Sequence, residues 1–249
     1  MTETNPSNIT ESTLIEEWDF SRNKDLDPSL ISLGSNKKVW WICGQADDHV
    51  WETTVYNRSN GQGCPFCAGK KVGKSNCLAT TDPVLANEWH PYKNNGLTPF
   101  NVTKGSNKKV WWLCKLGSDH EWEAQINDRS SGNGCPICRG LKVVKSNSLS
   151  TLNPELAKQW HPTKNGNLTP LDFTTGSSKK VWWLCKKAPD HEWESSIKNR
   201  TKGRGCPMCR GLYVVKSNCL STTHSKLASE LHPKKNGTIN GDNIHGQST

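Results

Sequence analysis

The chain has 249 residues and a formal net charge of +9, and only 33% of its residues are hydrophobic although it holds 12 tryptophans and 11 cysteines. This composition excludes one large apolar core and favours small units stabilised partly by cross-links or metal. No segment approaches the roughly 20 apolar residues of a membrane-spanning helix, and the polar first residues do not match a secretory signal.

The sequence repeats itself at a constant interval, which indicates tandem structural units. Trp18, Trp89 and Trp160 are equally spaced, and no insertion interrupts the repeat. A fourth copy begins as KLASELHPKKNG, places Leu231 where the tryptophan is expected, and reaches no cysteine. We therefore predict the following organisation: an N-terminal tail over 1–13, modules over 14–84, 85–155 and 156–226, and a partial fourth repeat over 227–249.

Each copy begins with a predicted short helix. In NPELAKQWHP, Asn153 is a candidate N-cap, Pro154 suits the first helical position and Pro162 is a stop signal. This helix would place Leu156 and Trp160 on one face. The TKNGNLTP that follows is rich in turn-forming residues.

Two strands are predicted next, at 108–114 (KKVWWLC) and 120–129 (HEWEAQINDR) in the middle copy. Trp122, Ala124 and Ile126 alternate with polar residues, which is the period of a half-buried strand, and the short connection predicts a hairpin. Adjacent strand residues face opposite sides. The outward tryptophan of each WW pair is therefore either packed under a neighbouring helix, which we favour, or a stacking platform for a base.

Each copy also carries the pattern C-x5-H-x14-C-P-x-C, which predicts a metal site. The C-x-x-C pair grips one ion from a tight knuckle, and the Cys-x5-His pair brackets the hairpin turn. Four nitrogen and sulfur ligands favour a closed, structural, tetrahedral zinc site, so we expect three zinc ions per chain. The predicted ligands are Cys43, His49, Cys64, Cys67, Cys114, His120, Cys135, Cys138, Cys185, His191, Cys206 and Cys209.

The cysteine pattern has a second interpretation, because C-x-x-C also occurs in redox proteins. Those motifs follow a strand in a larger βαβ domain, and that pattern is absent. Cys77 and Cys219 match Ser148 of the middle copy, so we leave them out of the sites. An odd number of cysteines without a signal argues against disulfides, and we expect reduced thiols in a cytoplasmic compartment.

With these motifs in view, the chain resembles a bacterial and viral family of probable zinc-ribbon or treble-clef domains of unknown function. The shared text in the middle copy is EWHPYKNNGLTP, GSNKKVWWLC, HEWEAQINDR and GNGCPICRG. The resemblance implies the twelve ligands above and a role in nucleic-acid binding or targeting, often beside a nuclease domain. Copy one departs from the pattern at Asp19 and Val50, where the others have histidine and glutamate. No nuclease domain follows, so we expect a stand-alone array, a truncated protein or one subunit of a split system.

The resemblance and the spacing together predict a small α+β fold stapled by metal. We expect three tandem zinc-ribbon or treble-clef-like modules, each made of a short helix, a β-hairpin and a CPxC knuckle. The partial fourth repeat has no zinc ligands.

The basic charge is concentrated in the third copy, where residues 156–226 carry 13 basic and 4 acidic side chains. Residues 14–84 carry 8 basic and 9 acidic side chains. This asymmetry predicts that the third copy contacts phosphates with little sequence reading, against the alternative of a solvated basic face. The predicted nucleic-acid-binding residues are Arg58, Arg129, Lys179, Lys180, Lys198, Arg200, Lys202, Arg204 and Arg210.

Arg58, Arg129 and Arg200 recur at one position of the repeat, after the second strand. Two roles are open for them: bidentate phosphate contact, or hydrogen bonds to the loop carbonyls before GCP. The repeated lysine pairs before the tryptophans are expected to protect a strand edge.

Two other function classes compete with this interpretation. The D-H dipeptide at Asp48 and His49 is similar to the base of HNH nucleases, but the histidine is needed for zinc and no second histidine completes a catalytic metal site. A protein-interaction scaffold is the main alternative, because the acidic balance of copy one suits a protein partner. We predict a non-catalytic array that binds nucleic acid, DNA more than RNA, with a nuclease subunit as a candidate protein partner and neither a membrane nor a small-molecule substrate.

Overall fold

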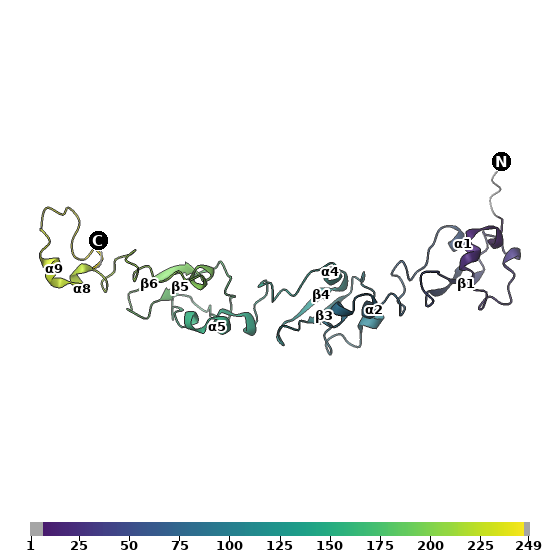
Figure 1. The fold of residues 1–249 in the computed structure, drawn as a ribbon, viewed down its shortest axis with the longest axis horizontal. Helices are drawn as coiled ribbons and strands as arrows, with labels where there is room; N and C mark the ends of the chain where they lie inside the picture. Colours follow the sequence, from purple (N-terminus) through teal and green to yellow (C-terminus); the bar gives the residue numbers. More distant parts are fainter. Residues whose placement is uncertain (1–6, 247–249) are drawn as a thin grey trace. The chain divides into compact units, whose positions relative to one another are not determined.

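The computed structural model describes residues 7–246 (Figure 1). The chain divides into two compact units, Met1–Gly134 and Cys135–Thr249. Within the described residues, no helix has the length and apolarity needed to cross a membrane. The elements in chain order are η1 (Ile9–Glu11), η2 (Thr13–Glu17), η3 (Pro28–Leu30), β1 (Lys38–Ile42), β2 (Val50–Thr54), α1 (Val55–Ser59), α2 (Leu78–Thr81), α3 (Pro83–Ala86), η4 (Pro99–Asn101), β3 (Lys109–Leu113), β4 (Glu121–Gln125), α4 (Ile126–Ser130), η5 (Lys145–Asn147), α5 (Leu149–Leu152), α6 (Pro154–Ala157), β5 (Lys180–Leu184), β6 (Glu192–Ser196), α7 (Ile197–Thr201), α8 (Leu220–Thr223) and α9 (Ser225–Ser229).

Each full repeat contains one two-stranded antiparallel hairpin: β1–β2, β3–β4 and β5–β6. The register places two tryptophans opposite each other, as in Trp112 and Trp122 of the second hairpin. The predicted hairpins are therefore confirmed. The second strand is shorter than predicted, because β4 ends at Gln125 and the chain turns into α4 at Ile126. Ile126 stays fully buried, since the helix turns this side chain toward the core.

A third extended segment pairs with the edge of each hairpin. The helix predicted in NPELAKQWHP begins where expected, with the Asn153 side chain accepting from the amide of Leu156 at 3.1 Å. It ends at Ala157, however, and Trp160 lies in an antiparallel bridge with Trp183. Our prediction that Trp160 is helical is therefore wrong. The open strand edge offers unpaired backbone groups, and pairing with them outweighs one more helical turn.

The predicted module boundaries cut through helices, because 84/85, 155/156 and 226/227 fall inside α3, α6 and α9. The helix pair that spans a boundary bonds to residues farther along the chain, ahead of the next hairpin. The amide of Leu78 donates to the carbonyl of Val102 at 2.7 Å, and that of Leu149 to Phe173 at 2.7 Å. A repeat period determines the length of a unit but not the position of its first residue, and these bonds connect each helix pair to the residues that precede the next hairpin.

The two ends of the chain correct the prediction further. Residues 1–6 and 247–249 lie outside the described residues, but residues 7–13 are not a tail: Ile9 is fully buried in the first core, and its amide donates to the carbonyl of Ile31 at 3.3 Å. The partial fourth repeat folds as the beginning of a module. It begins inside α9, and the amide of Leu220 in the preceding helix α8 donates to the carbonyl of Ile244 at 2.9 Å.

The core of each full repeat is built on tryptophan. The second tryptophan of each WW pair is completely buried (Trp41, Trp112 and Trp183). The rings of Trp89 and Trp112 form a T-shaped contact with centroids 5.5 Å apart, which is a favoured aromatic geometry. The first tryptophan of the pair lies on the other face, and Trp40 is 37% exposed. The guanidinium of Arg22 lies over this ring, 5.8 Å from its centroid. Our expectation of core packing for the outward tryptophans is therefore wrong.

Candidate metal centres

The structure brings the twelve predicted ligands together in three groups. In each group the nitrogen and sulfur atoms all lie within 4.8 Å of one another. The groups are Cys43, His49, Cys64 and Cys67; Cys114, His120, Cys135 and Cys138; and Cys185, His191, Cys206 and Cys209. Three sites with three cysteines and one histidine each are consistent with three zinc ions.

The distances within a group fit tetrahedral zinc. Sulfurs held about 2.3 Å from one ion at tetrahedral angles lie about 3.8 Å apart. Cys43 Sγ and Cys67 Sγ are 3.7 Å apart, and His49 Nδ1 lies 3.7 Å from Cys64 Sγ and 3.5 Å from Cys67 Sγ. The third group repeats this geometry, with 3.6 Å between the sulfurs of the first and last cysteines. The donor set fills four positions and leaves none for a substrate.

The hairpin and the knuckle position the ligands from two sides. Cys43 directly follows β1 and His49 directly precedes β2, and the amide of Cys43 donates to the carbonyl of His49 at 3.0 Å. This pair brackets the turn, as the spacing predicts. In the knuckle of the third repeat, the amide of Cys209 donates to Cys206 Sγ at 3.4 Å. An amide directed at sulfur favours the thiolate that zinc requires.

The histidine ligand is oriented by a serine that sequence reasoning missed. Because Nδ1 of His49 faces the sulfurs, Nε2 is free to bond outward, and it lies 3.0 Å from Ser75 Oγ. The amide of Ser75 in turn donates to Asp48 Oδ2 at 2.9 Å, and hydrogen bonding by Ser75 lowers the pKa of Asp48. Outer partners of this kind fix the ring and its tautomer. Asp48 of the D-H dipeptide therefore accepts a hydrogen bond from the same serine that orients the His49 ring.

The recurring tripeptide KSN is the signal that could have identified this serine. It occurs at 74–76, 145–147 and 216–218. In the third repeat the amide of Ser217 donates to Asp190 Oδ2 at 2.9 Å, as in the first. The Oγ of Ser217 and Nε2 of His191 are both buried and without a partner among the described residues. These are the two atoms that bond to each other in the first repeat.

Burial and mutual proximity raise the pKa of the last cysteine of the first and third groups to about 12, for Cys67 and for Cys209. The desolvation of the thiolate is the largest cause, and the neighbouring sulfurs add to it. Without a cation, the thiols of Cys67 and Cys209 therefore hold protons at neutral pH. Zinc binding has to replace those protons, which couples metal affinity to pH.

The recurring arginine is buried, which corrects its assignment to the nucleic-acid surface. Arg58, Arg129 and Arg200 are only 7–8% exposed. Arg200 lies between two tryptophan rings, 5.3 Å from the centroid of Trp183 and 5.1 Å from that of Trp193. In all three copies, Nη1 of the arginine donates to the loop carbonyl two residues before the first knuckle cysteine. The loop-carbonyl role therefore replaces the phosphate role for these three residues.

The remaining predicted contact residues are exposed. None of them has an acidic partner among residues 7–246; they are Lys179, Lys180, Lys198, Lys202, Arg204 and Arg210. Cys77 and Cys219 are buried and lie in none of the three groups.

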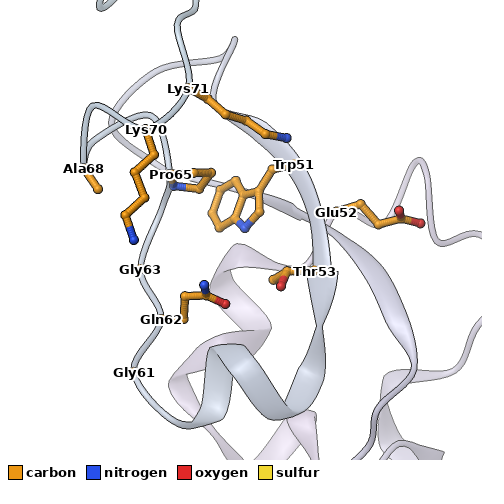
Figure 2. Close-up of a pocket in the computed structure, with 10 residues that line it drawn as sticks. All are labelled: Trp51, Glu52, Thr53, Gly61, Gln62, Gly63, Pro65, Ala68, Lys70 and Lys71. Carbon is orange, nitrogen blue, oxygen red and sulfur yellow. The ribbon is translucent and has the colours of Figure 1, made fainter. Parts of the chain in front are cut away.

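A cleft of about 360 Å³ lies between β2 and the zinc knuckle of the first repeat (Figure 2). Figure 2 shows the indole of Trp51 beside Pro65, with Lys70 next to Pro65 and Lys71 next to Trp51, while Glu52 points away from them. Neither lysine has an acidic partner among the described residues. The cleft is therefore polar and basic at its rim.

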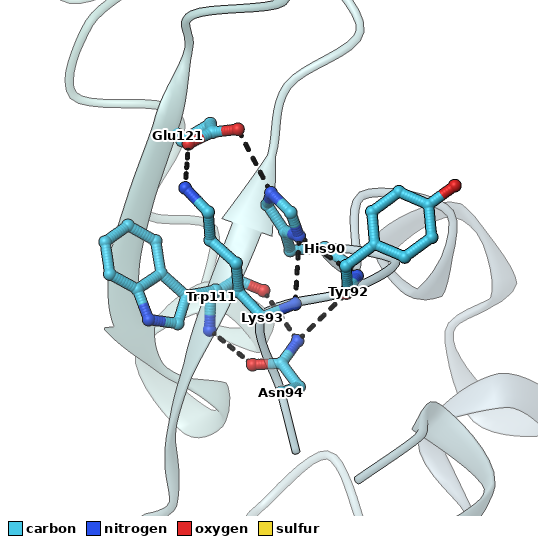
Figure 3. A network of polar contacts seen from close by, with 6 residues as sticks. All are labelled: His90, Tyr92, Lys93, Asn94, Trp111 and Glu121. Atoms are coloured by element: carbon cyan, nitrogen blue, oxygen red, sulfur yellow. Dashed lines mark hydrogen bonds and ion pairs between the residues drawn. The ribbon is translucent and has the colours of Figure 1, made fainter. Parts of the chain in front are cut away.

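A polar network holds the third extended segment to the hairpin in the second repeat (Figure 3). Nε2 of His90 lies 3.1 Å from Glu121 Oε1, and the ammonium of Lys93 pairs with the other oxygen while lying 4.7 Å from the Trp111 centroid. Lys93 is the first cause of the lowered pKa of Glu121. The third repeat has the same network.

The two departures of copy one are explained by this network. Asp19 stands where the other copies have the histidine, and Val50 stands where they have the glutamate. Asp19 pairs instead with Arg22 at 2.7 Å, and Arg22 lies over Trp40. In copy one the carboxylate is therefore on the opposing segment and not on the hairpin, and the two substitutions compensate each other.

Comparison with known families agrees with this geometry. The family described as a probable treble clef zinc finger domain matches residues 14–70, 85–141 and 156–212. These segments cover more than half of the chain, and the chain belongs to this family. A comparison with curated proteins finds no match.

Proposed function

We propose that this chain is a non-catalytic zinc-repeat protein that binds nucleic acid, DNA in preference to RNA, as the targeting or accessory component of a nuclease or defence-type assembly. The phosphates are contacted mainly by the third repeat. Zinc holds each module together, because three thiolates and one imidazole close the coordination sphere. Reduced zinc-binding thiols fit a reducing compartment such as the cytoplasm.

One observation carries the proposal: the exposed cations of the third repeat have no acidic partners among the described residues. Lys198 lies on α7, Lys202 and Arg204 lie on the loop before the knuckle, and Arg210 follows the last ligand. Four such cations in so short a stretch attract phosphate and release counterions on binding. A solvated salt-bridged surface would pair such cations with nearby carboxylates.

The cleft of the first repeat supports a position for the strand beside the zinc knuckle. Gln62 and Ala68 line that cleft, and the residues at the same positions of the third repeat are Arg204 and Arg210. The third repeat thus has arginines at two cleft positions where the first repeat is neutral, and Leu212 and Tyr213 at the positions of Lys70 and Lys71, so its cations lie at other places in the cleft. Arginine binds phosphate in a bidentate way, so this exchange favours backbone contact beside the knuckle.

The test is a charge reversal in full-length zinc-loaded protein. The variant Lys198→Glu, Lys202→Glu, Arg204→Glu leaves the buried Arg200 intact. Its matched control reverses three exposed lysines elsewhere, at Lys24, Lys104 and Lys115. Binding to labelled duplex DNA, and to RNA of the same sequence, is followed by fluorescence anisotropy across a salt series.

The third-repeat variant is expected to lose at least about tenfold in affinity at low salt and to flatten the salt slope by about 2–3, since each lost phosphate contact lowers it by about one. The control is expected to lose less. Equal losses in both variants would refute the assignment to the third repeat. Absence of binding by the unmodified chain would refute the nucleic-acid function.

A protein-interaction scaffold is the second candidate, and the outer face of the hairpins favours it. Trp111 is bordered there by Lys109 and Glu123, which form an ion pair at 3.3 Å, and by Glu121. Carboxylates beside an aromatic ring repel phosphate, whereas mixed charges around an aromatic suit a protein surface. Salt-insensitive capture of a protein partner, with no nucleic-acid binding, would support this function.

A further inference from the structure

The segment after the third zinc site is folded like the first part of a module, but no hairpin lies against it among the described residues. In the second and third repeats, three contacts join this first part to its hairpin. The corresponding groups can be followed in the segment 219–246, which we call the acceptor segment.

In the first contact, an asparagine side chain makes the two backbone hydrogen bonds that a neighbouring strand would make. Oδ1 of Asn94 accepts from the amide of Trp111 at 2.8 Å, and its Nδ2 donates to the carbonyl of the same residue at 3.0 Å (Figure 3). Asn165 makes the same two bonds to Trp182, at 2.8 and 2.9 Å. One side chain thus satisfies both backbone groups of an edge residue.

The second contact is the histidine–lysine pair that binds the glutamate at the start of the second strand. His161 lies 2.8 Å from Glu192, and Lys164 pairs with the same carboxylate while lying 4.6 Å from the Trp182 centroid. The histidine is held ready by two backbone amides: those of Thr163 and Lys164 donate to its Nδ1 at 3.2 and 3.1 Å.

The third contact is apolar. Leu85 and Leu156 are only 7% and 6% exposed. Leu156 belongs to the core cluster that contains Trp183 of the hairpin. Burying a leucine of this kind contributes to the docking of the hairpin through the hydrophobic effect.

The acceptor segment has the same groups in the same local geometry. Leu227, His232, Lys235 and Asn236 stand at the repeat positions of Leu156, His161, Lys164 and Asn165. The amides of Lys234 and Lys235 donate to His232 Nδ1 at 3.2 and 3.1 Å. Nδ2 of Asn236 donates to the His232 carbonyl at 3.2 Å, as Asn94 does to His90.

Within the part of the chain that the structure describes, these groups have no hairpin to bind. Leu227 is 52% exposed, and His232, which corresponds to two buried histidines, is exposed. Within residues 7–246, Oδ1 of Asn236 and the ammonium of Lys235 have no partner. The three hairpins described in the chain are each held by their own repeat.

We propose that the acceptor segment binds a β-hairpin from outside residues 1–249, of the type found in this chain: two adjacent tryptophans on the first strand and a glutamate at the start of the second. Asn236 selects an open strand edge, Leu227 an apolar side chain, and His232 with Lys235 a carboxylate beside an aromatic ring. Leu231 is smaller than the tryptophan of the other repeats and leaves room for the incoming indole. Residues 227–249 carry no net charge, which argues against phosphate as the ligand.

The experiment uses the full zinc-loaded chain and a fluorescein-labelled synthetic peptide of residues 179–218, which contains β5, β6, α7 and the four ligands of the third site. The peptide is loaded with one zinc ion. Anisotropy measures its affinity, and hydrogen exchange with mass spectrometry locates the protected residues. Asn236→Ala and His232→Ala remove two contacts, and Lys234→Ala is the matched control beside them.

We expect saturable one-to-one binding, protection of residues 224–236, and at least a tenfold loss for Asn236→Ala and His232→Ala but not for Lys234→Ala. A peptide with Trp182→Ala and Glu192→Gln should bind at least tenfold more weakly. Protection elsewhere, or equal binding by all variants, would overturn the proposal, as would no binding by a zinc-loaded peptide.

A second arm covers the case in which the peptide does not hold zinc by itself. Thr249 stands at the repeat position of Ser178, so appending a copy of residues 179–218 after Thr249 continues the repeat in register. The extended chain should bind four zinc ions and protect the amides around Leu227, and Asn236→Ala should abolish that protection. Four zinc ions without added protection at residues 224–231 would refute the acceptor role.

Discussion

The buried arginine of the third repeat differs from its counterparts in its acceptor. Nη2 of Arg129 pairs with the carboxylate of Glu88, whereas Nη2 of Arg200 donates to the amide oxygen of Gln159 at 2.6 Å. Burial lowers the pKa of Arg200. The group that accepts from its Nη2 is a neutral amide and not a carboxylate. Exchanging the two acceptors, by Glu88→Gln in one variant and Gln159→Glu in another, tests whether the guanidinium is a structural centre of each module.

The expected size of the effect follows from the type of hydrogen bond. A bond to a charged partner contributes about 1.5–3 kcal/mol and a neutral bond about 0.5–1.5 kcal/mol, so the difference is about 1 kcal/mol. The Glu88 side chain is 27% exposed, and solvent screening keeps the value at this lower end. Gln159→Glu should therefore stabilise the third repeat by about 1 kcal/mol, and Glu88→Gln should destabilise the second by a similar amount.

Native-state hydrogen exchange measures each module separately, which a single unfolding curve of a repeat array does not. About 1 kcal/mol corresponds to a roughly fivefold change in the protection of amides in α7 for Gln159→Glu and in α4 for Glu88→Gln. Each variant leaves the other module as its internal control. Unchanged protection in both modules, or changes of the same sign, would contradict the structural role of the arginines and reopen their assignment to phosphate.

Three further predictions concern the zinc sites and the tryptophans. Ser75→Ala should weaken zinc binding at the first site by about 10–100-fold, measured by chelator competition against the exposed control Ser178→Ala, because His49 loses the partner that orients it; equal affinities would contradict this role. Trp112→Ala should destabilise the second repeat by about 3–5 kcal/mol, and Trp111→Ala, at a half-buried position, should destabilise it by only about 1–2 kcal/mol, as judged by hydrogen exchange; similar losses in the two variants would be evidence against the assignment of Trp112 as inward and Trp111 as outward. Zinc loading should release protons into a weakly buffered indicator solution, and acid should weaken binding, because the metal-free thiol of Cys67 has a pKa of about 12 and zinc holds the thiolate; loading without proton release would show that the thiols ionise before the metal arrives.

The zinc ligands and the hairpins could be predicted because their signals are local. Cys-x5-His around a short turn places both side chains at one end of a hairpin whatever the rest of the chain does, and C-P-x-C forms a knuckle by itself. Threefold recurrence then separated this pattern from chance. The alternation of Val39 and Trp41 with outward-facing residues likewise marks one buried strand face without tertiary information.

The wrong predictions concern residues that could pair with either of two partners. Trp160 could continue a helix or pair with a strand edge, and only the position of Trp183 decides for the edge. The outward Trp40 could face a helix or solvent, and the side chain that covers it, Arg22, comes from the opposing segment. Ser75 could not be recognised as a support for zinc, because its partner His49 lies 26 residues earlier.

The sequence by itself thus determined the repeat period, the twelve zinc ligands, the three hairpins and the concentration of positive charge in the third copy. Only the tertiary structure decided that helix pairs span the predicted module boundaries, that Arg58, Arg129 and Arg200 are buried between tryptophans, and that the last described segment is left without a hairpin. Spacing along the chain is recorded in the sequence, whereas burial and pairing are properties of the neighbours that folding brings together.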